Sequence, residues 1–275
     1  MERITKKTIM NLKTPCLQNF TKAKNLEAMP PEVNLGNSNG EKDYVHPLII
    51  PPGCRCFDCG DTGYRDYWKN GYHYVEKCHC YQQRVANLAM KKAGVNQDYT
   101  FDNFVVQAEH QKQMLMLAKR FVDCGYVKGN WCYIGGQVGS GKTHICTAML
   151  NQLISFGKEA QYMQWVYDSI QLKSLVASGN DYNQRLMQLC RIPVLYIDDF
   201  YKSPPTEADK KLAFQLINYR YQNQSLVTIF SSELPIAQVI ALDEAVGSRI
   251  FERCCNYLFF NERNSQNNYR LNKEG

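Results

Sequence analysis

The chain has 275 residues, of which 44% are hydrophobic and 21% charged, and these values exclude a fibrous repeat, a coiled coil and a chain disordered throughout. The formal net charge is +6, and the excess of Lys and Arg is spread along the chain, so charge alone identifies no partner. No apolar run is long enough to span a bilayer, and the basic start leads into no apolar segment, so we expect no membrane span, no secretory signal and a cytoplasmic location.

Residues 1–53 are rich in polar side chains and contain the pairs Pro30-Pro31 and Pro51-Pro52. They show no sustained helical or strand period, so they offer little apolar surface for a core. We therefore predict a flexible arm with one short helix near Phe20–Met29.

Five of the twelve cysteines lie within residues 54–80. Two pairs, Cys56 with Cys59 and Cys78 with Cys80, are separated by 18 residues. Four thiolates suit tetrahedral Zn²⁺, so this pattern predicts a zinc-binding module. A redox dithiol at the first pair is the alternative, but it leaves the second pair unexplained. Three further side chains compete as metal ligands: Cys54, His73 and His79.

A basic helix is predicted over Arg84–Lys92, with Gly94 as its end. From Tyr99 onward, short apolar strands alternate with longer amphipathic stretches, which is typical of βαβ units on a parallel sheet. The sequence thus predicts three parts: an arm (1–53), a zinc module with a linker helix (54–95) and an α/β domain (96–275).

Within the α/β domain the apolar runs predict five buried parallel strands. They are Trp131–Ile134, Gln161–Gln164, Val194–Ile197, Leu226–Ser231 and Tyr257–Phe260. The predicted helices are Lys142–Phe156, Trp165–Ala177, Thr206–Asn223, Ala237–Leu242 and Gly247–Arg253. Thr206 and Asp209 form a capping-box start, and Gly157 ends the first of these helices.

A phosphate-binding loop is predicted directly after the first strand of this domain, because residues 136–143 match G-x-x-x-x-G-K-[ST] between a strand and a helix. Glycines let backbone N–H groups close around phosphates, Lys142 reaches the β- and γ-phosphates, and the Thr143 hydroxyl suits Mg²⁺. The predicted nucleotide-binding residues are Gly136, Gln137, Val138, Gly139, Ser140, Gly141, Lys142, Thr143 and His144.

Two carboxylates, Asp198 and Asp199, follow the apolar strand Val194–Ile197. Ligands of open α/β sheets bind at the carboxyl ends of the strands, so both groups belong at the phosphate loop. We expect Asp198 to hold Mg²⁺ through water and Asp199 to orient or deprotonate the attacking water.

With these motifs placed, residues 54–275 resemble the DnaC-type and IstB-type AAA+ ATPases, most closely the DnaC-like helicase loaders of phages and mobile elements. The resemblance runs through the first cysteine pair, the phosphate loop and four further segments: 196–202, 217–221, 231–234 and 247–253. It implies a five-stranded ASCE core that binds ATP and Mg²⁺, ATP-dependent assembly into an open ring or spiral, and a zinc-bearing N-terminal region that grips a replicative helicase.

The resemblance also implies roles for residues outside the phosphate loop. The polar sensor of the family falls on Ser231, Ser232 and Glu233, and the strand before it should neighbour the strand of Asp198. Arg249 matches the arginine finger. The resemblance includes two further arginines: Arg253, for which a surface salt bridge is an equal alternative, and Arg270 near the C-terminus, for which no role follows.

Asp199 departs from the family, because many AAA+ proteins carry Glu there. The shorter side chain holds water less well, so we expect slow hydrolysis.

We expect single-stranded DNA to contact the predicted inner-loop region of the ATPase domain. Basic side chains there would bind DNA phosphates, and tyrosines would stack on bases. The candidates are Lys173, Arg185, Lys202, Lys210, Lys211, Tyr182 and Tyr201.

The sequence therefore predicts an ATP-hydrolysing loader that delivers a replicative DNA helicase onto single-stranded DNA. One alternative is an IstB-like transposition helper, which the zinc module disfavours. The other is a nucleotide-gated adaptor for DNA or protein with little hydrolysis, which Asp199 keeps open.

Overall fold

The computed structural model describes residues 55–262. The predicted arm, its short helix near Phe20–Met29, Cys54 and Arg270 lie outside the described residues. The described chain belongs to two compact units: residues 66–75 to one, and residues 55–65 with 76–262 to the other.

A β-hairpin lies between the two cysteine pairs. Its strands are β1 (Tyr64–Lys69) and β2 (Tyr72–Lys77). The turn residues Asn70 and Gly71 both have positive φ, 53° and 79°. Asn-Gly is the pair that such a tight turn favours, because both positions must adopt the left-handed conformation. This two-stranded sheet was not predicted from the sequence.

Helix α1 (His79–Ala93) follows the hairpin directly and is longer than the predicted Arg84–Lys92. Gly94 ends it in the left-handed conformation, as predicted. The buried side chains of α1, Ala86, Met90 and Ala93, belong to the same hydrophobic cluster as the buried face of α3 (Lys142–Ser155). The end of α1 is therefore packed into the α/β core.

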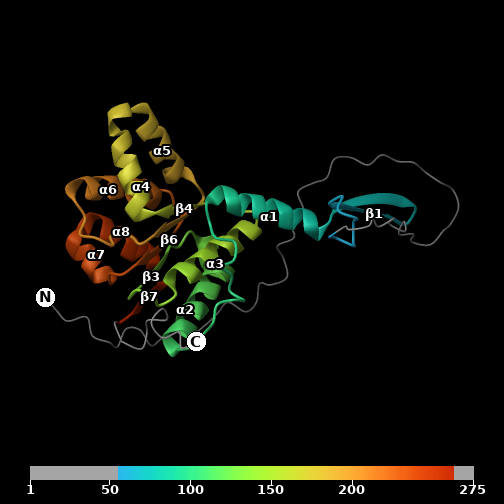
Figure 1. Ribbon diagram of the computed structural model, residues 1–275, viewed down its shortest axis with the longest axis horizontal. Helices are drawn as coiled ribbons and strands as arrows, with labels where there is room; N and C mark the ends of the chain where they lie inside the picture. The colour runs from blue at the N-terminus through green and yellow to red at the C-terminus, as the bar shows by residue number, and fades with distance from the viewer. Residues whose placement is uncertain (1–54, 263–275) are drawn as a thin grey trace. The chain divides into compact units, whose positions relative to one another are not determined.

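The core is a five-stranded parallel sheet, and all five predicted strands are confirmed (Figure 1). Strand β6, which leads into the predicted polar sensor, neighbours β5, which ends at Asp198, as predicted. The order across the sheet is β4-β5-β6-β3-β7, with β3 (Cys132–Gly136), β4 (Ala160–Gln164), β5 (Val194–Asp198), β6 (Val227–Ser232) and β7 (Leu258–Asn261).

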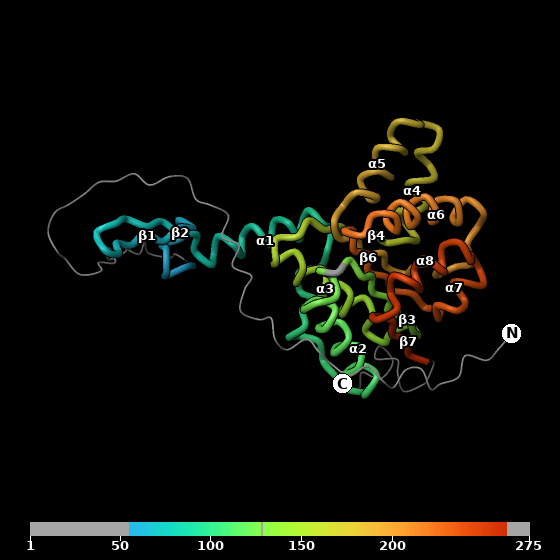
Figure 2. The backbone as a smooth tube through the Cα atoms, turned by 180° about the vertical axis from the view of Figure 1, so that it is seen from behind, coloured from blue at the N-terminus to red at the C-terminus, as the bar shows by residue number. Residues whose placement is uncertain are grey.

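Helices cover both faces of this sheet (Figure 2). Successive side chains of a strand point to opposite faces of the sheet. In β3, Tyr133 packs in the cluster with α4–α8, whereas Cys132 and Ile134 pack in the cluster with α1–α3. The remaining helices are α2 (Glu109–Arg120), α4 (Trp165–Ser174), α5 (Asn180–Arg191), α6 (Glu207–Gln222), α7 (Ile236–Leu242) and α8 (Glu244–Cys254). Short helical turns lie at Phe121–Gly125, Tyr126–Lys128 and Leu175–Ser178.

The helix predicted over Trp165–Ala177 is confirmed as α4, which ends at Ser174 and is followed by the short turn Leu175–Ser178. The separate helix α5, after Gly179, was not predicted. Helix α2 was also not predicted. Both starts lack a side-chain cap of the Ser, Thr, Asp or Asn type, which is the signal that marked α6. Within residues 55–262, no helix combines the length and apolar character needed to cross a membrane.

Candidate functional site

The segment between β3 and α3 forms a glycine-rich loop, in the strand-loop-helix setting that the sequence predicts. Gly139 and Gly141 have φ values of 77° and 93°. A Cβ atom on Gly141 would stand 2.8 Å from the Phe104 ring. Larger residues are therefore disfavoured here both by backbone conformation and by space.

Lys142 opens α3 and is mostly buried, with 7% of its surface exposed. Its ammonium donates to the carbonyl oxygens of Gly136 at 2.8 Å and Gln137 at 2.7 Å, so the side chain folds back over the loop. Burial lowers the pKa of Lys142, and the nearby carboxylates of Glu233 and Asp199 oppose this shift. The cation is held in place by carbonyl dipoles and facing acids.

Asp198 ends β5 next to the start of α3, and Thr143 Oγ1 donates to Asp198 Oδ1 at 3.3 Å. The two predicted Mg²⁺ ligands therefore lie together, although they are 55 residues apart in sequence. Asp198 is buried, with 3% of its surface exposed. A buried carboxylate needs several donors, and the hydroxyls that donate to it besides Thr143 are those of Tyr162, Tyr196 and Ser231.

Asp199 follows in the left-handed conformation, with a φ of 54°. Its N–H donates to Asp198 Oδ1 and to Ser231 Oγ, both at 3.1 Å, which fixes the turn at the end of β5. Its carboxylate accepts from Lys202 Nζ at 2.8 Å, and the same ammonium lies 3.5 Å from Glu233 Oε1. Asp199 and Glu233, both predicted site residues, are thus bridged by one lysine.

The glycine-rich loop and the side chains beyond the end of β5 line one cavity of about 430 Å³. Part of its wall is the loop and the charged residues Lys142, Asp199, Lys202 and Glu233. Another part of the wall was not predicted from the sequence, because it comes from an irregular segment without periodicity and from α2. Its residues are Tyr99, Asn103, Phe104, Val105 and Gln111.

His144 fixes this second wall against α3. Its ring stacks on Tyr99 with centroids 4.6 Å apart and meets the Phe104 ring edge-on at 5.1 Å. Its Nε2 lies 3.0 Å from the Thr100 carbonyl oxygen and 3.0 Å from Asn103 Oδ1. Two acceptors around one nitrogen require that Nε2 carries the proton.

Arg249 does not line this cavity. It lies on α8, donates from Nε to Asn218 Oδ1 at 3.1 Å, and sits over the rings of Phe214 and Tyr221. The Arg253 guanidinium makes its contacts within the fold. It lies over the Trp131 ring and donates hydrogen bonds to the carbonyl oxygens of Gly129, Tyr221, Gln224 and Leu226. These partners are backbone carbonyl oxygens, so the surface salt bridge expected as the alternative for Arg253 is not observed.

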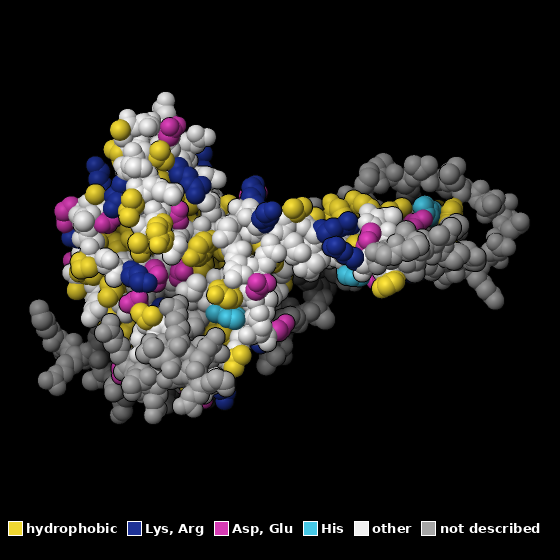
Figure 3. All heavy atoms as spheres, in the orientation of Figure 1, with side chains coloured by type: hydrophobic (Ala, Val, Ile, Leu, Met, Phe, Trp, Pro, Cys, Tyr) yellow, Lys and Arg dark blue, Asp and Glu magenta, His cyan; other side chains and the backbone are white. Residues whose placement is uncertain are grey.

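Several of the candidate DNA contacts have partners within the fold. Lys173 pairs with Asp209, Lys210 with Glu207, and the Tyr201 hydroxyl donates to Asp243. Lys202 faces the cavity described above. On the face drawn in Figure 3, basic and acidic side chains are interspersed, and no single large basic surface stands out.

The four predicted zinc ligands come together at the start of α1. Cys78 is its N-cap and Cys80 lies in its first turn. The Sγ atoms of Cys56 and Cys78 are 3.6 Å apart, those of Cys59 and Cys80 are 3.3 Å apart, and all four lie within 4.8 Å of one another. A tetrahedral ZnS₄ site needs sulfur atoms about 3.8 Å apart, so the cluster fits the ion.

The electrostatics of the cluster also suit a cation. Burial raises the pKa of Cys59, but hydrogen bonds from Cys80 and the Gly63 N–H outweigh it and lower the value to about 6. The pKa of Cys80 is raised to about 12, chiefly by its hydrogen bond to Cys59. One thiolate therefore opposes ionisation of the next, and a bound cation relieves that repulsion. Among the competing ligands, His79 Nδ1 lies near Cys78 at 3.6 Å, whereas His73 pairs with Asp66 on the hairpin.

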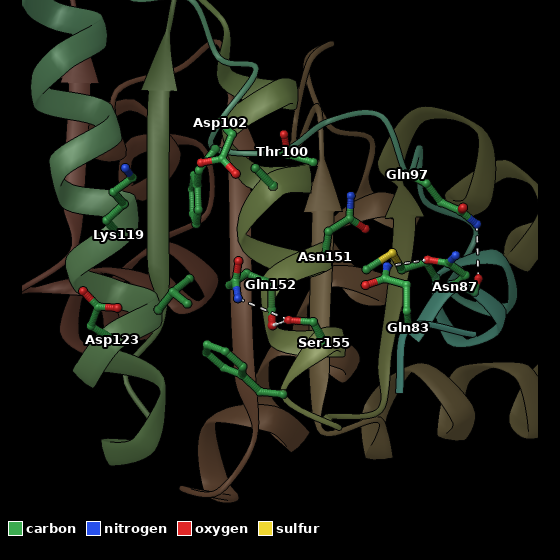
Figure 4. Close-up of a pocket in the computed structure, with 15 residues that line it drawn as sticks. Gln83, Asn87, Gln97, Thr100, Asp102, Lys119, Asp123, Asn151, Gln152 and Ser155 are labelled. Carbon is green, nitrogen blue, oxygen red and sulfur yellow. Dashed lines mark hydrogen bonds between the residues drawn. The ribbon is translucent and has the colours of Figure 1, made fainter. Parts of the chain in front are cut away.

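A second cavity, of about 440 Å³, lies along the C-terminal half of α3 and is lined by α1, α2 and the segment between them (Figure 4). Its polar lining consists mainly of amides and hydroxyls, such as Gln83 and Asn87, which are bonded to each other at 3.1 Å. None of the residues predicted for catalysis, nucleotide or metal binding lines it.

A parallel sheet with a phosphate loop after one strand and an acidic end on another defines a P-loop nucleotide-binding protein. The family model of the IstB-like ATP binding protein matches residues 75–273. The chain belongs to this family of AAA+ ATPases.

Two relatives from Bacillus subtilis (strain 168) illustrate the family. The chain is 31% identical to the uncharacterized protein YqaM over 205 residues, which cover 70% of this chain and 64% of YqaM. It is 29% identical to the phage-like element PBSX protein XkdC over 223 residues, which cover 74% of this chain and 80% of XkdC. The chain thus spans less than two thirds of YqaM.

Solved structures share the fold. The DnaC helicase loader superposes with a TM-score of 0.52 at 21% identity, covering 61% of this chain and 97% of that chain. The replication initiator DnaA bound to AMPPCP and single-stranded DNA superposes with a TM-score of 0.54 at 21% identity, covering 62% of this chain and 51% of that chain. The α/β domain therefore shares its fold with these two proteins.

Proposed function

We propose that the protein binds and hydrolyses ATP with Mg²⁺ at the phosphate loop and uses this cycle to deliver a replicative DNA helicase onto single-stranded DNA. The observation that carries the proposal is the convergence of Lys142, Thr143, Asp198, Asp199 and Glu233 around the glycine-rich loop. These are the group types that phosphoryl transfer requires: a cation for the phosphates, ligands for the metal ion, and a carboxylate for water.

The fit of a phosphate group to the loop is supported by Ser140. Its hydroxyl is buried, with 1% of the residue exposed, and it has no hydrogen-bond partner in the described part of the chain. A buried hydroxyl without a partner is costly, and a phosphate oxygen would satisfy it. Backbone N–H groups of residues 136–143 and the Lys142 ammonium would complete the anion site.

Each remaining residue has a distinct part in the proposal. Thr143 and Asp198 would hold Mg²⁺, whose bound form neutralises the phosphate charge. Asp199 would orient the attacking water, and Glu233 would lie on the γ-phosphate side of the cavity. The wall formed by Tyr99, Phe104 and His144 would receive the base, because flat rings stack on a purine.

Zinc and partner binding belong to the cysteine module. Cys56, Cys59, Cys78 and Cys80 would hold one Zn²⁺ as a closed structural site, which leaves no open position for catalysis. We assign helicase binding to residues 54–95, with or without the arm (1–53), and ATP and single-stranded DNA binding to residues 96–275. The fold that the chain shares with the DnaC helicase loader and with DnaA supports this division.

The nucleotide part of the proposal is tested with Lys142→Ala in the full-length protein. Removing the ammonium leaves phosphate charges uncompensated, so we expect ATP affinity to fall at least about tenfold and hydrolysis to be lost. Lys112→Ala, on the exposed face of α2, is the matched control and should behave as wild type. Equal ATP affinity in Lys142→Ala and wild type would refute the loop assignment.

The partner part is tested with Cys78→Ser/Cys80→Ser, again in the full chain. Elemental analysis should find one zinc per wild-type chain and none in the variant, and the variant should lose helicase capture while keeping basal ATP hydrolysis. Cys255→Ser, an exposed thiol outside the cluster, is the control. Zinc content unchanged by the double substitution would refute the four-thiolate site, and helicase capture without zinc would move partner binding elsewhere.

The two alternatives give different outcomes in the same experiments. Release of phosphate, measured with and without single-stranded DNA, separates an ATPase from a nucleotide-gated adaptor. A protein that hydrolyses ATP and binds DNA but captures a transposase in place of the helicase would be a transposition helper. Slow hydrolysis agrees with the proposal, because Asp199 is one methylene shorter than Glu.

A further inference from the structure

Lys202 lies in the proposed ATP site, although its sequence position suggested a DNA contact. The chain after β5 curls tightly, because Asp199 and Tyr201 both adopt the left-handed conformation, with φ values of 54° and 52°. The Lys202 N–H then donates to the Asp199 carbonyl oxygen at 3.1 Å. This turn aims the Lys202 side chain back at the end of the sheet.

The ammonium of Lys202 meets two carboxylates there. It donates to Asp199 Oδ2 at 2.8 Å and lies 3.5 Å from Glu233 Oε1. The carboxylate side chains are only 19% and 18% exposed, whereas the lysine side chain is 43% exposed. Solvent thus reaches the cation more than the acids, and the acids depend on it for compensation.

The charge balance of the cavity explains why a second cation matters. Its lining carries the carboxylates of Asp199 and Glu233 against the ammonium groups of Lys142 and Lys202. Without Lys202, two carboxylates would face one ammonium, and the Asp199 carboxylate would lose the cation that compensates its charge and holds it in place. Lys142 is already directed to the carbonyl oxygens of Gly136 and Gln137, so it does not take over the contact with Asp199.

We propose that Lys202 is a positioning residue for ATP hydrolysis: it holds the Asp199 carboxylate through Oδ2, leaves Oδ1 to accept a hydrogen bond from water, and compensates Glu233. This inference rests on the proposed ATPase function. A rigid carboxylate orients water with less loss of conformational freedom than a free one, so Lys202 acts on the chemical step more than on nucleotide affinity. The backbone of Asp199 is already fixed in the left-handed conformation, and the ion pair restrains the rotation of its side chain.

The test compares Lys202→Met, Lys202→Arg and Lys112→Met in the full-length protein without DNA. Lys112 is the matched control, since it also pairs with a carboxylate three residues earlier, Glu109 at 3.9 Å, but on the exposed face of α2. We measure kcat and KM for ATP, together with ATP affinity. For Lys202→Met we expect kcat to fall about tenfold or more with KM changed less than about threefold. Lys202→Arg should restore part of kcat, and Lys112→Met should match wild type.

A second measurement keeps a structural effect apart from positioning. In the Asp199→Asn background, Lys202→Met should cost little further activity, because the carboxylate that it positions is gone. An undiminished kcat in Lys202→Met, a loss confined to KM, or an equal further loss in the Asp199→Asn background would each overturn the inference. Wild-type protein that neither binds nor hydrolyses ATP would overturn the proposed function and the inference together, whereas an active wild type with an unaltered Lys202→Met overturns the inference alone.

Discussion

At the scale of single residues, the carboxylate of Asp198 is the group most surrounded by donors. Tyr162 OH donates to Oδ2 at 3.0 Å and Tyr196 OH donates to Oδ1 at 2.7 Å, while Ser231 and Thr143 also donate to Oδ1. Hydroxyl donors stabilise the charged form and fix its orientation without adding a competing cation. The two phenols thus form an outer layer around the proposed metal ligand.

We predict that Tyr162→Phe and Tyr196→Phe each weaken the Mg²⁺ dependence of ATP binding, raising the Mg²⁺ concentration at half-saturation about tenfold. Outer partners of metal ligands typically contribute this much, because they hold the ligand oxygen in position. Phenylalanine keeps the contact between the two rings, whose centroids are 5.3 Å apart, so the fold should survive. A Mg²⁺ titration of nucleotide binding measures the effect.

Tyr182→Phe is the control for these variants, because its hydroxyl donates to Gln215, not to Asp198. It should leave the Mg²⁺ titration unchanged. Phenylalanine variants of Tyr162 and Tyr196 that titrate like wild type would show that Asp198 needs neither phenol.

At the scale of secondary-structure elements, one fully buried arginine joins three of them. Arg220 of α6 donates to the carbonyl oxygens of Leu189, Cys190 and Ile192 at the end of α5, and to Val227 and Thr228 of β6. Burial lowers its pKa to about 9, which still leaves it charged at neutral pH. The cation caps the last turn of α5, where helix carbonyl oxygens lack partners.

We predict that Arg220→Met lowers the free energy of unfolding by about 3 kcal/mol or more. Methionine fills part of the space but leaves several buried carbonyl oxygens without donors, and each such group costs about 1–3 kcal/mol. Urea unfolding followed by circular dichroism measures the change. Arg191→Met, at the exposed end of α5, should change stability by less than about 0.5 kcal/mol. Similar losses in both variants would contradict the capping role.

The same scale shows what sequence patterns reveal and what they do not. The five strands were predictable because each contains a short, largely apolar run. The inner strands β3, β5 and β6 are buried throughout, whereas the edge strands β4 and β7 are mostly half-buried. Helix α2 was missed because its N-cap residue, Ala108, has no side chain that can cap the helix. The contact at its start comes from a residue inside the helix, since Gln111 Oε1 accepts hydrogen bonds from the N–H groups of Gln107 and Ala108. Helix α5 was missed because its start, after Gly179, has no side-chain cap.

The site was predictable only where function imposes a local motif. The phosphate loop is one continuous stretch of sequence, and so is the acidic end of β5. The chemistry of each could therefore be inferred from residue type and spacing. The wall of Tyr99, Phe104 and His144, and the bridge from Lys202 to Glu233, arise where distant segments meet. No periodicity or spacing signals such contacts, because they depend on the path of irregular segments.

At the scale of the whole molecule, α1 is a continuous connection between the cysteine cluster and the α/β core. Its N-cap, Cys78, and its first-turn residue Cys80 belong to the cluster, whereas Met90 and Ala93 near its end are buried with α3. Deleting residues 1–95 would remove these side chains from the core. Substitutions in the full chain are therefore the cleaner way to separate partner binding from ATP hydrolysis.

The position of Arg249 leads to a prediction about assembly. Arg249 lies on α8, outside the cavity, where its guanidinium covers the partly exposed ring of Phe214. We propose that this guanidinium acts on the γ-phosphate bound by a neighbouring subunit, so that self-association would complete the ATP site.

We predict that Arg249→Ala and Asp199→Asn are each nearly inactive alone but regain ATP hydrolysis when mixed. In the mixture, an Arg249→Ala subunit still has Asp199, and an Asp199→Asn neighbour still supplies Arg249, so the two together form complete sites. Random assembly of equal amounts gives such pairs at roughly a quarter of the interfaces, so activity should approach about a quarter of the wild-type rate. The rate is measured at constant total protein and at several concentrations, since a shared site also makes hydrolysis concentration-dependent. A mixture no more active than the average of its components, at concentrations where wild type is active, would mean that Arg249 acts within its own subunit or not at all.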